Sequence, residues 1–398
     1  MTCCLGEKTR NRWKKRGDKV WLRLFEKGAH TVSYEMDEKT YAMQNAGGDI
    51  FEAPLPYSSG FHYVQIFVEG REVLSPLLPI GYGCSRPYNY VDILSEKEDF
   101  LALRDVPQGA VHEELFFSGV TGEWERCLVY SPPVSWTASE PIPVLYLQHG
   151  HGENEIGWIA QGKVGILLDN LLAEGKIVPF AVVMNNGMVQ KKDPGAAGGH
   201  VVDHRLLEPM LLQDVIPFLE AKYYVGGSRT KRGMAGLSMG SMQTSSMICK
   251  HPDLFSEVGI FSGFLHDWIS TDEDANAHPA ALQGGENFRN QFHTFFRAIG
   301  ENDPFFQKFG ESGTGSGQDE PRNKHFYMSV KLDNTRVNRD MNNYLQEIIQ
   351  HLMVVDGADV EMRLEVQVDA SKGIPSSTVR TVSENCKTLK VTDFGFDD

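Results

Sequence analysis

The spacing of hydrophobic and polar positions divides the chain into three regions. In the first, residues 19–93, short apolar runs alternate with turn-forming residues, and no stretch has a helical period of useful length. The clearest run is FHYVQIFVEG, residues 61–70, in which β-branched and aromatic residues end at a Glu-Gly turn. This pattern predicts a small all-β sandwich, which we place within residues 1–95.

The second region, residues 96–312, alternates apolar runs with helical stretches. It opens with a predicted hairpin, in which HEELFFS and EWERCLVYSPP flank a turn at residues 119–122. Continuous apolar runs follow at 144–147, 180–184, 233–236, 258–262 and 295–299. The helical stretches between them include 164–173, 209–223 and 241–250. Buried runs alternating with helices indicate an α/β fold, with a parallel sheet that is covered by helices on both faces.

The third region, residues 313–398, has a different pattern. The polar segment GESGTGSGQDEPRNK, which begins at Gly310, is typical of a linker. A helix is predicted at 336–352, and a strand follows at 360–368, where apolar and mostly polar residues alternate. We therefore expect a small α+β tail.

Composition and charge exclude several classes of function. The chain has 398 residues, 38 Lys and Arg against 53 Asp and Glu, a formal charge of −15 and no basic stripe, which argues against nucleic-acid binding. No apolar run approaches the roughly 18–20 residues that span a bilayer, so no membrane segment is expected. The polar N-terminus does not resemble a signal peptide; the sequence as written predicts a cytoplasmic protein, or a secreted one if a leader was removed.

The cysteines predict neither a disulfide scaffold nor a metal site. There are six, they are sparse, and none forms a C-x-x-C pair. No His or Cys cluster has the spacing of metal ligands. We expect reduced thiols, no metal and no organic cofactor.

The most informative motif is Gly236-Leu237-Ser238-Met239-Gly240, between a short apolar strand and a helix. A serine on a sharp strand-to-helix turn needs strained backbone angles, and glycines two residues to either side relieve the crowding. The turn lifts the Ser238 hydroxyl from the sheet edge and places the Met239 N–H at a helix N-terminus, where it stabilises an oxyanion. We predict Ser238 as a nucleophile, with an unremarkable Gly-rich turn as the alternative.

A second loop offers another oxyanion donor. The strand at 144–147 runs into His149-Gly150-His151-Gly152, a loop that would supply the second oxyanion N–H in a fold of this kind. We expect the amide of His151 to serve, with the amide of Gly152 as the next candidate. The imidazoles of His149 and His151 are not expected to act as acid or base.

A catalytic triad also needs an acid after a later strand. Asp303 follows the run at 295–299 in a Gly-Glu-Asn-Asp-Pro turn, and it is the predicted acid. A solvated turn aspartate is the alternative. Asp169 and Asp214 lie within helical stretches and are poorer candidates.

At this point residues 111–309 resemble the esterase-D-like α/β-hydrolases, closest to the enterochelin-esterase and feruloyl or acetyl-xylan esterase branch. The sandwich is similar to the immunoglobulin-like module that precedes such esterases. The resemblance implies Ser238 as nucleophile, Asp303 as acid, and the amides of Met239 and His151 as oxyanion donors. It is carried by Leu147–Asn154, Trp158, Gln161-Gly162, Asp169–Leu171, Met184–Gly187, Gly236–Gly240, Phe261–Gly263 and Phe295–Pro304.

One family block is missing. Members carry Gly-His-x-Trp after the acid, and its His is the general base, but only His325 and His351 follow Asp303 here. His325 is our candidate for the base, because His351 falls late in a predicted helix of the tail. The tail faintly resembles the C-terminal end of large prokaryotic ATPases of unknown function. We therefore expect a junction with foreign sequence near residues 310–323.

The resemblance implies a serine esterase that hydrolyses carboxylic esters. The implied substrates are feruloyl or acetyl esters of plant cell-wall polysaccharide or its oligosaccharides, with siderophore esters second. The rival hypothesis, supported by the missing block, is a hydrolase-fold binding protein that lacks its general base. The sequence gives no prediction of the oligomeric state.

Overall fold

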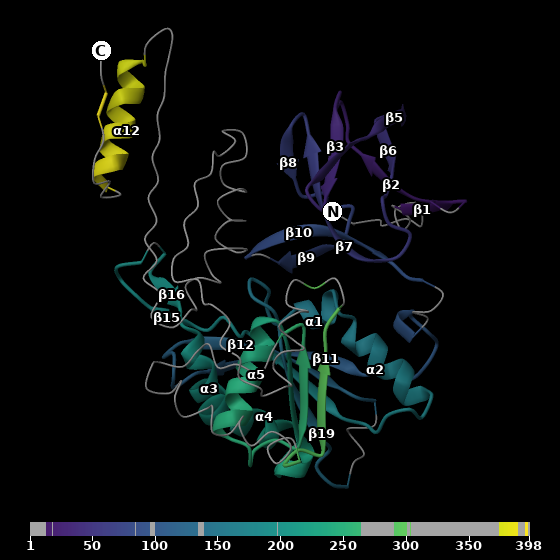
Figure 1. Cartoon of the computed structure of the whole chain (residues 1–398), viewed down its shortest axis with the longest axis vertical. Coiled ribbons are helices and arrows are strands. Elements are labelled where there is room, and N and C mark those ends of the chain that lie inside the picture. The colour runs from purple at the N-terminus through teal and green to yellow at the C-terminus, as the bar shows by residue number, and fades with distance from the viewer. Residues whose placement is uncertain are drawn as a thin grey trace, which may run out of the picture. The chain divides into compact units, whose positions relative to one another are not determined.

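The structure is a computed structural model. It describes residues 13–17, 19–83, 85–95, 100–133, 139–196, 198–263, 290–300, 303, 374–388 and 395–396. The chain divides into two compact units, Met1–Arg322 and Asn323–Asp398, and each is described by itself. Figure 1 shows the chain with many of its helices and strands labelled.

The first part of the larger unit is all-β, as predicted. One sheet has the strand order β1-β2-β6-β5, and the other has the order β4-β3-β7-β10-β9, with β8 paired to β7. Buried residues alternate with more accessible ones along β2, where Val20, Leu22 and Leu24 are buried in the core between the sheets. The strands are β1 (Trp13–Arg16), β2 (Lys19–Phe25), β3 (Val32–Met36), β4 (Lys39–Ala42), β5 (Gln44–Gly47), β6 (Ile50–Pro54), β7 (Gly60–Val68), β8 (Arg71–Val73), β9 (Ile80–Gly83) and β10 (Arg86–Ile93).

The second part is built on a seven-stranded sheet of order β11-β12-β14-β13-β17-β18-β19. In the predicted hairpin β12 pairs antiparallel with β11, and β12 also pairs antiparallel with β14; strands β14, β13, β17, β18 and β19 pair parallel to one another. All five predicted apolar runs are strands of this sheet. Its strands are β11 (Ala110–Phe117), β12 (Trp124–Ser131), β13 (Val144–Gln148), β14 (Ala181–Asn185), β17 (Arg232–Leu237), β18 (Glu257–Phe261) and β19 (Thr294–Ala298). A separate hairpin joins β15 (Gln190–Lys192) and β16 (His200–Val202).

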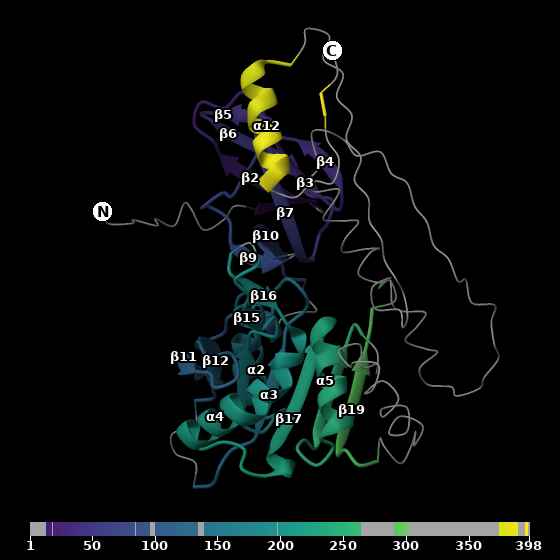
Figure 2. The same cartoon turned by 90° about the vertical axis from the view of Figure 1, so that its left-hand side faces the viewer.

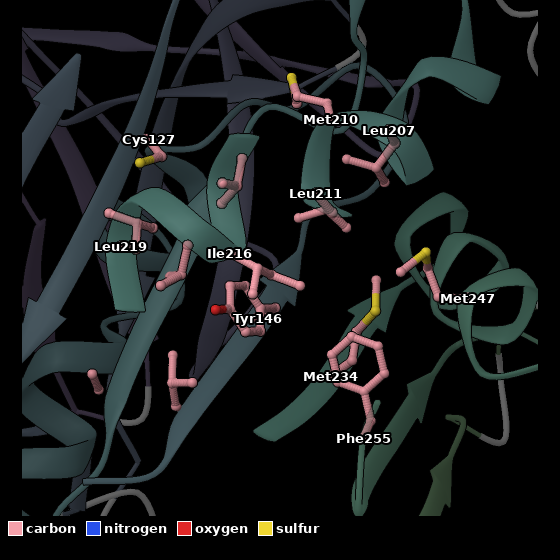
Figure 3. Packing of buried hydrophobic residues seen from close by; sticks show 14 of the residues in the cluster. Cys127, Tyr146, Leu207, Met210, Leu211, Ile216, Leu219, Met234, Met247 and Phe255 are labelled. Atoms are coloured by element: carbon pink, nitrogen blue, oxygen red, sulfur yellow. The ribbon is translucent and has the colours of Figure 1, made fainter. Parts of the chain in front are cut away.

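Helices cover both faces of this sheet, which confirms the predicted α/β class. On one face α3 (Leu207–Met210), the π-helical turn η5 (Leu211–Val215), α4 (Ile216–Tyr223) and α5 (Met239–Lys250) enclose a core that includes Tyr146, Met234 and Phe255 (Figure 3). On the other face α1 (Gly157–Ala160) and α2 (Val164–Ala173) pack over a second apolar cluster. Figure 2 shows α5 lying along β17, the strand that leads into it. The 3₁₀ turns are η4 (His204–Leu206) and η6 (Arg229–Lys231).

In the smaller unit the structure describes one helix, α12 (Ser376–Thr388), which the sequence analysis did not predict. The helix expected at 336–352 and the strand expected at 360–368 lie outside the described residues. Within the described part of the chain, no helix is long and apolar enough to cross a membrane.

Candidate active site

Ser238 occupies a strained turn between β17 and α5. Its backbone angles are φ 52° and ψ −115°, which are neither helical nor extended. The Ser238 N–H donates to the carbonyl of Phe261 on β18 at 2.9 Å, and the N–H of Ser241 donates back to the Ser238 carbonyl at 2.9 Å. The neighbouring strand and the first turn of α5 therefore hold this conformation from both sides. Such outliers concentrate at functional sites, where the surrounding structure over-determines them.

The glycines that flank Ser238 are required by close backbone approaches. A Cβ on Gly236 would lie 2.1 Å from the carbonyl oxygen of Gly240. A Cβ on Gly240 would lie 2.6 Å from the carbonyl oxygen of Gln148 on β13. The crowding that the motif predicts is therefore observed on both sides of the serine.

The two predicted oxyanion donors lie at the carboxyl edge of the sheet. Met239 is the first residue of α5, so its N–H points out of the positive end of a twelve-residue helix. His151 lies in the loop after β13, which runs parallel to β17 as its neighbour. The amide of Gly152, the second candidate in this loop, is already engaged. Its N–H donates to the sulfur of Met188 at 3.1 Å. Of the two loop amides, His151 is therefore the better candidate.

The imidazole of His149 holds an adjacent loop. Its Nε2 accepts from the N–H of Gly187 at 2.9 Å, and its Nδ1 lies 2.7 Å from the carbonyl oxygen of Gly150. Because an amide N–H can only donate, Nε2 is unprotonated and the proton resides on Nδ1. The Gly187 carbonyl in turn accepts from Gln243 of α5 at 2.8 Å. The buried side chains of His149 and Gln243 thus join β13, β14 and α5 beneath the site, a role that motif reasoning missed.

The imidazole of His151 is partly buried near that of His204, with ring centroids 6.0 Å apart. Burial lowers the pKa of His151, and the nearby His149 lowers it further. The pKa of His204 is also lowered, chiefly by burial. Both rings are therefore expected to be neutral at pH 7. They add no positive charge beside the loop that carries the His151 amide.

Asp303 lies beyond the carboxyl end of β19, two strands from β17. Its N–H donates to the carbonyl of Gly300 at 3.0 Å, which closes the predicted turn, and its side chain is half-buried. The structure thus brings Ser238, Met239, His151 and Asp303 to one edge of the sheet. His325, the predicted base, and His351 lie outside the described residues.

The two poorer candidates for the acid have structural roles. Asp169 is buried on α2 and accepts from the Tyr130 hydroxyl at 2.6 Å and from the Gly109 N–H at 2.9 Å. Asp214 accepts from the Ser118 hydroxyl at 2.6 Å and fixes the turn of the β11–β12 hairpin. Among the described residues, no group of three His, Cys, Asp or Glu side chains is placed to hold a metal ion.

Comparison with known proteins decides the family. The sequence model of a family described as "Putative esterase" matches residues 118–332, more than half of the chain. The chain belongs to this esterase family. The match includes Ser238, Asp303 and His325, and it continues past residues 310–323, where the sequence predicts a junction.

Two curated relatives are similar to this esterase-family chain over part of their length. An endo-1,4-beta-xylanase/feruloyl esterase of Xylanibacter ruminicola is 36% identical over 213 residues, which cover 52% of this chain and 29% of that protein. Endo-1,4-beta-xylanase Y of Acetivibrio thermocellus is 24% identical over 204 residues, which cover 48% of this chain and 18% of that protein. The matched region thus spans less than a third of either relative.

The solved structure of the enterobactin esterase from Shigella flexneri is also similar. It is 14% identical in sequence, the alignment covers 75% of this chain and 85% of that one, and the TM-score is 0.49.

Proposed function

We propose that this chain is a serine hydrolase of carboxylic esters with Ser238 as its nucleophile. The observation that carries the proposal is the strained conformation of Ser238 at the junction of β17 and α5, where the Met239 N–H opens a helix. A preorganised donor at that position stabilises the charge that develops on the carbonyl oxygen, and one such donor contributes about 10²–10³ in kcat. The chain's membership of an esterase family supports the same chemistry.

The reaction proceeds in two steps. The Ser238 Oγ attacks the ester carbonyl, His325 takes the hydroxyl proton, and the amides of Met239 and His151 bind the oxyanion. The tetrahedral intermediate then collapses, the C–O bond to the alcohol breaks, and His325 returns the proton to the leaving alcohol. Water, deprotonated by the same imidazole, hydrolyses the acyl-enzyme and releases the acid and free Ser238. Asp303 orients the base throughout.

His325 is proposed as the base because it lies within the family match and follows Asp303 closely in sequence. Without a base, a serine hydroxyl is a weak nucleophile. The His325→Ala variant is therefore expected to lose most of its activity, with a residual rate that the oxyanion amides maintain.

The proposed substrates are feruloyl or acetyl esters of plant cell-wall polysaccharide or its oligosaccharides. The support is the 36% identity to a protein named as an endo-1,4-beta-xylanase/feruloyl esterase. In the proposed mechanism the amides of Met239 and His151 stabilise the negative charge on the carbonyl oxygen, so the reaction as written uses no metal ion.

The test compares the hydrolysis of methyl ferulate and p-nitrophenyl acetate by the wild-type chain with that by Ser238→Ala and His325→Ala. Ser228→Ala is the matched control, since Ser228 is an exposed serine of the same domain. We expect Ser238→Ala to lose about 10³-fold or more in kcat, and Ser228→Ala to retain wild-type rates. Equal background rates for the wild-type chain and Ser238→Ala would overturn the proposal in favour of a non-catalytic protein. Full activity in His325→Ala would assign the base elsewhere.

A further inference from the structure

The loop that carries the His151 amide is bound from outside by the N-terminal sandwich. We propose that Gln161 is a positioning residue, and that through it and Ser85 the β9–β10 edge of the sandwich holds this loop in its catalytic geometry. The loop, residues 149–163, follows β13 and includes α1. The inference rests on the proposed function, since it assigns the oxyanion role to this loop.

Both the oxygen and the nitrogen of the Gln161 carboxamide form hydrogen bonds with the sandwich. Its Oε1 accepts from the Tyr82 N–H of β9 at 2.8 Å, and its Nε2 donates to the Tyr63 hydroxyl of β7 at 2.5 Å. The Tyr63 hydroxyl donates onward to the Tyr82 carbonyl at 3.1 Å, which completes the network. The side chain at position 161 must therefore accept from Tyr82 and donate to Tyr63. An apolar side chain can do neither, and a carboxylate cannot donate.

Glycines of β9 make room for these contacts. A Cβ on Gly81 would lie 2.8 Å from the carboxamide carbon of Gln161. A Cβ on Gly83 would lie 2.7 Å from the Tyr63 hydroxyl. The absence of a side chain at Gly81 therefore lets β9 approach Gln161 of the loop, and its absence at Gly83 makes room for the Tyr63 hydroxyl that binds Gln161.

A second contact reaches the oxyanion segment itself. The Ser85 N–H, in the turn between β9 and β10, donates to the Gly152 carbonyl at 2.8 Å. Both residues have left-handed backbone conformations, with φ 61° for Ser85 and 72° for Gly152. The bond therefore joins two tight turns and fixes the chain immediately after His151.

Two further groups of the sandwich bind the end of the same loop. The Tyr90 hydroxyl of β10 donates to the Ala160 carbonyl at 3.1 Å, and Asp92 forms an ion pair with Lys163. From the opposite side, the indole N–H of Trp158 donates to the Gln148 carbonyl at 3.1 Å. The loop is thus bound between the end of β13 and the sandwich.

This arrangement predicts a kinetic effect. Oxyanion donors act only where the charge develops, and a misplacement of about 1 Å costs on the order of 10²-fold in rate. A contact that positions the donor therefore affects kcat and kcat/KM equally and leaves KM unchanged. For Gln161→Ala we expect a loss of about tenfold in kcat, smaller than the loss from removing the donor.

The test uses the full chain and p-nitrophenyl acetate, with Ser238→Ala as the inactive reference. The variants are Gln161→Ala, Gln161→Glu, Tyr63→Phe and the double variant Gln161→Glu/Tyr63→Phe. Gln65→Ala is the matched control, because Gln65 also lies on β7, is half-buried like Tyr63, and donates to Glu72 of the sandwich at 3.3 Å. Rates are expressed per active site, titrated with diethyl p-nitrophenyl phosphate, so that loss of folded protein does not mimic loss of kcat.

We expect Gln161→Ala to lose kcat at constant KM and Gln65→Ala to match the wild type. The double variant should lose less than the product of the single effects, because both single changes break the same bond. Hydrogen exchange in the peptide covering residues 149–156 should accelerate in Gln161→Ala and stay at the wild-type rate in Gln65→Ala. Unchanged kcat per active site and unchanged exchange, in an enzyme that Ser238→Ala inactivates, would overturn the inference alone. Equal rates for Ser238→Ala and the wild type would overturn the proposed function instead, and hydrogen exchange would still test the positioning role.

Discussion

The Nε2 of His149 accepts a hydrogen bond from the N–H of Gly187, with 2.9 Å between the two nitrogens. This contact fixes the Nδ1–H tautomer of a ring that is only 1% exposed. His149 thus links the segments that follow β13 and β14, and in the proposed mechanism another imidazole takes the proton of Ser238.

The role of His149 is tested by its tautomer and by the pH profile of a variant. In nitrogen-15 spectra we expect protonated Nδ1 and unprotonated Nε2 at pH 7. Replacement by alanine should lower kcat by about tenfold, because the loop at Gly187 loses its anchor, while the acidic limb of the kcat/KM profile persists. Loss of that limb in His149→Ala would show that His149 is the base after all.

The backbone approach at Gly240 gives a second prediction. In Gly240→Ala the new Cβ would overlap the carbonyl oxygens of Gln148 and His149, at 2.6 and 2.7 Å. We expect a loss of about 2–4 kcal/mol in the free energy of unfolding and loss of esterase activity. The control is Gly165→Ala in α2, where the Cβ meets nothing closer than 3.6 Å. There alanine should stabilise the helix by about 0.5–1 kcal/mol. A fully stable Gly240→Ala protein would contradict the turn geometry.

The buried carboxylate of Asp169 gives a third prediction. Asp169→Ala leaves the Tyr130 hydroxyl and the Gly109 N–H without their acceptor, and we expect a loss of about 2–4 kcal/mol in the free energy of unfolding. Asp105→Ala, an exposed aspartate of the same domain, should change it by less than about 0.5 kcal/mol. Urea denaturation measures both. An Asp169→Asn variant that loses activity but keeps its free energy of unfolding would contradict this account, because it would indicate that Asp169 is the catalytic acid.

Asp203 makes stability depend on pH. Hydrogen bonds and ion pairs from Arg205 and Lys191 hold the pKa of Asp203 well below its ordinary value. A depressed carboxyl pKa contributes stability above the unfolded-state pKa of about 3.9, and that contribution is lost as the pH falls toward the folded-state pKa. The wild type should therefore be more stable than Asp203→Asn by about 1 kcal/mol at pH 7. The difference should shrink below pH 4 in denaturant titrations; a difference independent of pH between 3 and 7 would argue against this origin.

The sequence predicted the strands and helices around Ser238 because each is specified locally. Continuous apolar runs occur where both faces of a strand are buried, and the helix predicted at 164–173 coincides with α2. The helix predicted at 209–223 was less simple, since it contains a π-helical turn before Pro217, whose nitrogen has no proton to donate. The glycine spacing around Ser238 could be interpreted without the structure, because few residues other than glycine fit beside a serine on a sharp strand-to-helix turn.

The contacts that join distant segments could not be predicted in the same way. Gln161 and Tyr63 lie 98 positions apart, and His149 and Gly187 lie 38 apart. Neither pair has a local signal, because the partner of a polar side chain depends on how the strands are ordered. The helix α12 was missed because its predominantly polar sequence, SSTVRTVSENCKT, has low apolar content.

The account depends most on Ser238 as the group that becomes acylated. The direct measurement is the intact mass and peptide map of the chain after treatment with diethyl p-nitrophenyl phosphate. We predict one diethylphosphoryl group per chain, on Ser238, formed equally in Ser228→Ala and absent from Ser238→Ala. Labelling of another residue, or equal labelling of Ser238→Ala, would contradict it.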